Sequence, residues 1–105
     1  MIELVATERL LDELRDALSK HSGIEDILVS RRTLRNALTS FLNGKVGAAD
    51  LVEWASAVEL HNDEIGYEPG FQQFIATFVF RLSTPEINEP VSRVLCQTMI
   101  AELVR

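Results

Sequence analysis

The stretch LVEWASAVELHNDE, residues 51–64, indicates the fold class more directly than any other part of the chain. Its apolar side chains recur at the spacing of one helix face, at Leu51, Trp54, Ala55 and Val58. Trp54 is the only tryptophan, and its register in this row predicts a ring packed inward with its N–H group near the surface. The pattern predicts an amphipathic helix that begins near Ala48 and ends by Gly66.

Four other segments show helical spacing of apolar side chains: residues 7–20, 30–42, 71–82 and 90–104. Ser30 is a good N-cap for the second of these, and Asn43-Gly44 is a typical helix end. The 71–82 helix is the most apolar, so we expect it at the centre of the core. Ser83 and Glu86 have capping-box spacing, which indicates a further one-turn helix.

Residues 24–29 are ambiguous. They fit a short helical turn, while Leu28 and Val29 alone also fit a strand stub. Helix or turn is the preferred interpretation, because a lone strand has no evident partner elsewhere in the chain. The predicted fold is therefore all-α: a compact, irregular bundle of about five helices in a single domain, residues 1–105.

Composition narrows the class of function. The net charge of −6 disfavours binding to nucleic-acid backbones and anionic membranes, both of which attract clustered cations. No apolar run approaches the ~20 residues of a membrane span, and the first residues lack the pattern of a secretory signal. The single cysteine, Cys96, lies in an apolar helical run and is predicted to be buried and unreactive. We expect a cytoplasmic protein.

Charge is unevenly distributed along the chain. Residues 1–45 hold seven acidic and seven basic side chains, whereas residues 46–90 hold eight acidic side chains and one basic one, Arg81. The acidic group is the name used below for five of these carboxylates and candidate partner-binding residues: Glu53, Glu59, Asp63, Glu64 and Glu68. His61 lies among them.

Three interpretations of the acidic group remain open. It is a solvated helix end that aids solubility, a recognition surface for a cationic partner, or a metal site that uses His61, Asp63 and Glu64. The metal site is the least favoured, because neighbouring helical positions point roughly 100° apart and no metal-binding motif is present. No nucleophile–base pair, phosphate loop or cofactor motif appears either, so we expect no enzymatic activity and no cofactor.

Three arginines occupy the first two turns of the helix that follows Ser30: Arg31, Arg32 and Arg35. Cations at this end oppose the helix dipole. They form either an anion-binding patch or ion pairs with the acidic half of the chain or of another subunit. Ion pairing is the preferred interpretation.

The middle of the chain resembles a set of small all-helical bacterial proteins. The similarity lies in ALTSFLNGKV (37–46), DLVEWA (50–55), and Val58-Glu59 before an acidic turn, within residues 34–82. That set includes immunity proteins, which neutralise toxins delivered between competing bacteria. The resemblance implies a helical fold and a binding role, and it implies no catalytic residues.

Together these observations predict a non-enzymatic binding protein of the immunity or antitoxin type. Its acidic group would pair with the basic active-site cleft of a toxin. The alternative is a homo-oligomer or a subunit of a larger complex, in which the three arginines of one copy meet the carboxylates of another.

Overall fold

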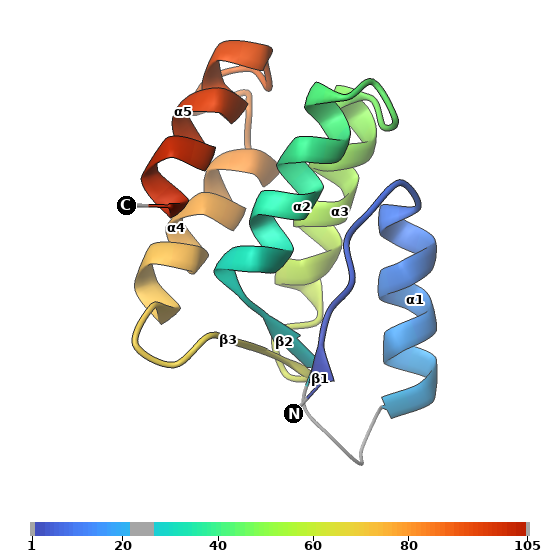
Figure 1. Cartoon of the computed structure of the whole chain (residues 1–105). Coiled ribbons are helices and arrows are strands. Elements are labelled where there is room, and N and C mark those ends of the chain that lie inside the picture. Colours follow the sequence, from blue (N-terminus) through green and yellow to red (C-terminus); the bar gives the residue numbers. More distant parts are fainter. Residues whose placement is uncertain (1, 22–26, 105) are drawn as a thin grey trace.

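Five helices and a small parallel sheet make up the part of the chain that the computed structural model describes, residues 2–21 and 27–104 (Figure 1). The elements in chain order are β1 (Ile2–Glu3), α1 (Leu10–His21), β2 (Ile27–Val29), α2 (Arg31–Leu42), α3 (Ala48–Leu60), β3 (Ile65–Tyr67), α4 (Gln72–Ser83) and α5 (Arg93–Leu103). The predicted number of helices and the compact packing are confirmed. None of the described helices is long and apolar enough to cross a bilayer.

The helix ends follow local hydrogen bonding. Ser30 caps α2 as predicted: its hydroxyl accepts from the Thr33 amide at 3.1 Å, while the Thr33 hydroxyl accepts from the Ser30 amide at 3.2 Å. Several predicted boundaries were wrong. Helix α1 begins at Leu10 rather than residue 7, and α3 ends at Leu60, so Gly66 lies in β3 and does not mark the end of the helix. The start of α5 is at Arg93 rather than residue 90, because Ser92 caps it. Residues 85–87 form a turn instead of a one-turn helix, since Ser83 is the last residue of α4.

The all-α prediction was incomplete, because the structure contains a three-stranded parallel sheet in the order β1-β2-β3. Residues 27–29 of the ambiguous 24–29 segment are its central strand, and residues 24–26 lie outside the described residues. Ile27 pairs with Ile2 on one side and with Ile65 on the other. The strand that seemed to have no partner therefore has two, each only two or three residues long.

Helices supply the crossovers that parallel strands require. The chain passes through α1 between β1 and β2, and through α2 and α3 between β2 and β3. Helix α3 packs against α1, α2 and α4, and α2 packs against α5 (Figure 1). The centre of the helical layer is therefore α3, with Leu51, Trp54 and Val58 fully buried, and not α4 as its apolar sequence suggested.

Candidate functional site

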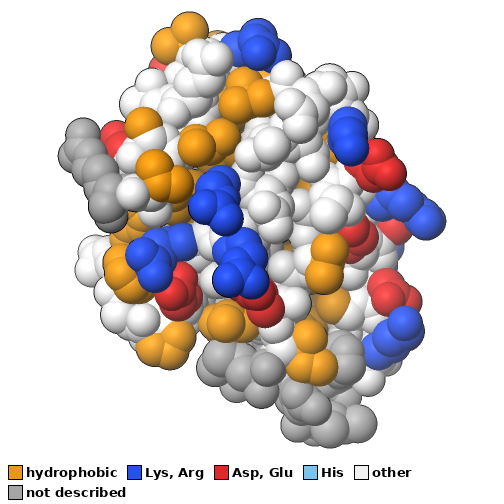
Figure 2. Space-filling view, viewed as in Figure 1, with side chains coloured by type: hydrophobic (Ala, Val, Ile, Leu, Met, Phe, Trp, Pro, Cys, Tyr) orange, Lys and Arg blue, Asp and Glu red, His pale blue; other side chains and the backbone are white. Residues whose placement is uncertain are grey.

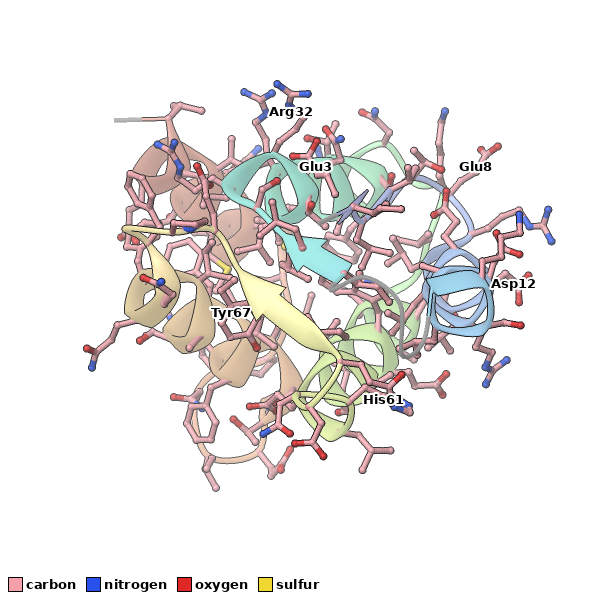
Figure 3. All side chains as sticks on the ribbon, turned by 90° about the horizontal axis from the view of Figure 1, so that it is seen from below. Glu3, Glu8, Asp12, Arg32, His61 and Tyr67 are labelled. Atoms are coloured by element: carbon pink, nitrogen blue, oxygen red, sulfur yellow. The ribbon has the colours of Figure 1, made fainter. Side chains whose placement is uncertain are left out.

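The carboxyl edge of the sheet gathers polar residues from all three strands. Glu3 ends β1, Ser30 and Arg31 follow β2, and Glu68 follows β3. Parallel strands end at the same edge, and in open α/β sheets ligands bind beyond this edge. Figure 3 shows Glu3 and Arg32 side by side at the start of α2, with His61 at the opposite side of the view.

Arg31 and Glu68 form the strongest contact at this edge. The Glu68 carboxylate accepts hydrogen bonds from the Arg31 amide at 3.0 Å, from Nε at 3.0 Å and from Nη2 at 2.9 Å. These hydrogen bonds hold the pKa of Glu68 below its ordinary value and raise the pKa of Arg31. The guanidinium also lies over the ring of Phe71, with 3.7 Å between its central carbon and the ring centroid.

A second set of contacts joins β1 to α2. The Ser30 hydroxyl donates to the Glu3 carboxylate, and the Thr33 hydroxyl donates to the Leu4 carbonyl at 3.0 Å. Ser30 and Thr33 are buried, so these hydrogen bonds are shielded from water. Arg32 Nη1 lies 3.6 Å from Glu3 Oε1, but its side chain stays 68% exposed and the contact is loose. Among the residues that the structure describes, Arg35 forms no ion pair.

Two pockets adjoin at this edge. The arginine pocket has a volume of about 390 Å³ and is lined by Glu3, Ser30, Arg31, Arg32, Arg35, Glu68, Leu103 and Val104. The phenylalanine pocket has a volume of about 400 Å³ and is lined by Arg31, Phe71, Phe74, Glu102 and Leu103. Arg31 and Leu103 line both. Figure 2 shows several cationic side chains gathered near the start of α2, with acidic and hydrophobic side chains between them, while others lie along the right edge and at the top of this view.

The structure does not keep the acidic group together as one free surface. Glu68 is bound by Arg31, and Glu59 is half-buried and accepts a hydrogen bond from the Ser83 hydroxyl of α4. Glu53 lies six residues before Glu59, and at roughly 100° per residue the two point to different faces of α3. Pairing between Arg31 and an acid of the later half agrees with the preferred interpretation of the arginines.

Of the remaining acids, Asp63 and Glu64 follow the end of α3, whereas Glu53 lies about two turns before it. Glu53 and Asp63 are exposed, and Glu64 Oε1 lies 3.8 Å from His61 Nδ1. Among the side chains that the structure describes, which lie within residues 2–20 and 27–104, no group of three or more His, Cys, Asp or Glu is arranged to hold a metal ion.

An exposed leucine accompanies these acids, and the sequence analysis missed it. Leu60, the last residue of α3, is 79% exposed. It lies in the same exposed helical row as Glu53 and Ser56 and comes just before Asp63 and Glu64. The sequence pattern could have indicated this exposure, because Leu60 falls outside the helical row in which the buried apolar residues of α3 recur.

Cys96 and Trp54 were both predicted to be buried, and both are, but the prediction for the Trp54 N–H group was wrong. Cys96 is fully buried, as predicted, and burial raises the pKa of its thiol to about 11, which disfavours the thiolate. Trp54 is also fully buried, but the predicted position of its N–H group was wrong. The indole Nε1 is buried and has no hydrogen-bond partner among the described residues, because α3 lies deeper than an amphipathic surface helix would.

Comparison of the chain with protein-family models, with curated proteins and with solved structures gives no match.

Proposed function

We propose that this chain is a non-enzymatic binding protein of the immunity or antitoxin type, which covers a basic cleft of a partner protein with the end of α3. The binding surface, called the α3 tip below, consists of Glu53, Leu60, Asp63 and Glu64. The observation that carries the proposal is the 79% exposure of Leu60 beside carboxylates that no arginine or lysine of the described chain pairs with.

The α3 tip combines one exposed apolar side chain with several carboxylates, a combination that suits the centre of a protein–protein interface. Burying an exposed leucine side chain on association gains about 1.5–3 kcal/mol, which makes Leu60 an apolar anchor. Carboxylates around it steer a cationic partner and reject anionic ones, even where each ion pair adds little affinity. The only base in residues 46–90, Arg81, pairs with Glu89 at 3.4 Å, so it does not offset the charge of the tip.

Two members of the acidic group, Glu59 and Glu68, are not part of the α3 tip. Glu68 accepts hydrogen bonds from Arg31, and Glu59 accepts one from Ser83, so both are already bound within the chain. Leu60, which is not in the acidic group, belongs to the α3 tip. The expected mechanism remains occlusion of a basic active site, as toxins that act on nucleic acids would present.

The test is co-purification of tagged chain from its native cells, followed by co-expression with the partner found or with the product of the neighbouring reading frame. Leu60→Asp, and Glu53→Lys combined with Asp63→Lys, should each reduce co-purified partner at least ~10-fold and abolish protection of growth. Matched controls are Ile87→Asp, at a leucine-sized side chain that is 68% exposed, and Glu86→Lys, at an exposed acid of the α4–α5 loop. Equal loss in the controls, or no stoichiometric partner at all, would refute the proposal.

The homo-oligomer is a second candidate, and one observation favours it. Arg35 is exposed and forms no ion pair among the described residues, so it is open to a carboxylate of another copy. Arg31 no longer supports this candidate, because Glu68 of the same chain binds it. Sedimentation at low and at high salt separates the candidates: a monomer under both conditions removes the charge-paired oligomer.

A further inference from the structure

The two adjoining pockets at the carboxyl edge of the sheet have complementary chemistry. One is lined by three arginines together with two carboxylates, Glu68, which binds Arg31, and Glu3, which contacts Arg32 loosely. The other is lined by two phenylalanine rings and Glu102, and Arg31 lines both pockets. We propose that together they bind a small phosphomonoester that carries a flat aromatic ring, as a nucleoside monophosphate does. This inference is independent of the α3 tip, since it uses none of the same residues.

The arginine pocket suits a phosphate dianion. Arg32 and Arg35 lie one turn apart on α2, and their guanidinium groups retain free N–H donors, because the contact of Arg32 with Glu3 is loose and Arg35 has none among the described residues. A phosphomonoester carries a charge of about −1.5 to −2 at pH 7, so it competes for two guanidinium groups better than a carboxylate does. The amides of Arg31 and Thr33 are already hydrogen-bonded, so side chains would supply the donors.

Arg31 has a different role from its two neighbours. Its guanidinium donates two hydrogen bonds to the Glu68 carboxylate and lies over the ring of Phe71, and these contacts fix its plane at the boundary of the pockets. A planar guanidinium held in this way offers its open face for stacking and its free N–H groups for the phosphate. It would orient the ligand, with the phosphate on one side and the ring on the other.

The phenylalanine pocket suits the ring. Phe71 and Phe74 meet edge to face, with 6.5 Å between their ring centroids, and Leu103 adds apolar lining to the same pocket. The Glu102 carboxylate in the same pocket is an acceptor for a ring amino or hydroxyl group. Each pocket has a volume of about 400 Å³ or slightly less, so both lie within the size range of small-molecule sites.

The experiment is isothermal titration of the full chain at low salt with five probes: phenyl phosphate, adenosine 5′-monophosphate, inorganic phosphate, benzoate and adenosine. Phenyl phosphate and the nucleotide should bind at least ~10-fold more tightly than the other three, which lack either the dianion or the ring. The overall charge of −6 repels anions, so saturable anion binding would report a local site.

Three variants locate the site. Arg35→Gln should weaken phenyl phosphate at least ~10-fold, whereas Arg15→Gln removes the same charge from an exposed position of α1 and should change nothing. Phe74→Leu should weaken the binding of both phosphomonoesters, phenyl phosphate and the nucleotide, and leave the binding of inorganic phosphate unchanged. Equal urea midpoints for the wild type and both arginine variants establish that folding is intact.

Four outcomes would overturn the proposal. The first three are no binding of either phosphomonoester at ~10 mM, equal loss in Arg15→Gln and Arg35→Gln, and binding of benzoate as tight as that of phenyl phosphate. The fourth comes from a sixth titration, with a tyrosine-phosphorylated peptide, if that peptide binds at least ~10-fold more tightly than phenyl phosphate. The third would assign the pocket to carboxylates, and the fourth would assign it to a protein ligand.

Discussion

Ile27 offers the most direct test of the sheet. Its side chain is fully buried at the start of β2, the central strand, between the positions of Ile2 and Ile65 on the two neighbouring strands. Replacement by alanine removes three carbon atoms from a close-packed core, and such Ile→Ala changes cost about 2–5 kcal/mol. That is a large share of the ~5–15 kcal/mol by which a domain is stable. The preferred sequence interpretation of this segment is a helix or turn. In a solvated surface turn, the same substitution would change the free energy of unfolding by no more than about 0.5 kcal/mol.

The assay is urea unfolding followed by the fluorescence of Trp54, which is the only tryptophan and is fully buried in the folded chain. For a slope m of about 1.5 kcal/mol/M, Ile27→Ala should lower the unfolding midpoint by roughly 1–3 M without changing m. The matched control is Ile87→Ala, the same substitution at a side chain that is 68% exposed. A midpoint for Ile27→Ala that equals that of Ile87→Ala would show that β2 is not part of the core.

Three further predictions concern single groups. Because hydrogen bonds from Arg31 lower the folded-state pKa of Glu68, its carboxylate stabilises the fold above the ordinary value of about 4.3, and this contribution is lost as pH falls through the lowered pKa. The difference in Tm between the wild type and Glu68→Gln should therefore be constant at neutral pH and shrink in acid; an equal difference at pH 7 and at about pH 2 would contradict it. Cys96, with a buried thiol of pKa about 11, should react with a thiol reagent at pH 8 only on unfolding, and rapid labelling of folded chain would contradict its burial. Ser30→Ala should cost about 0.5–2 kcal/mol in urea unfolding, and a cost no greater than that of Ser56→Ala, at an exposed position of α3, would show that the cap adds nothing.

The helices could be predicted because their signals are local. Leu51, Trp54 and Val58 repeat at helical spacing, and Ser30 lies three residues before Thr33, the partner in its cap. The sheet could not, because each strand has only two or three residues and pairs with residues more than twenty positions away. An apolar run this short fits a strand or a turn equally well, so the decision depends on a partner that no local pattern reveals.

The site was predicted in part for the same reason. Arg31 was expected to pair with an acid, but the identity of Glu68, 37 residues away, depends on β2 and β3 lying side by side. The acidic group looked continuous because its members are close in sequence. In the fold, Glu59 turns toward Ser83 of α4, and Glu68 lies beyond β3 at the carboxyl edge.

The same sheet separates the two proposed surfaces. The α3 tip precedes β3 and so lies at the amino edge of the sheet, whereas the arginine pocket lies at the carboxyl edge, and Figure 3 places His61 and Arg32 on opposite sides of the molecule. Groups that share no contact act nearly additively. Leu60→Asp should therefore leave phenyl phosphate binding unchanged, and Arg35→Gln should leave protein-partner binding unchanged. Loss of both activities in either variant would mean that one partner spans both edges, and the two sites would then have to be treated as one interface.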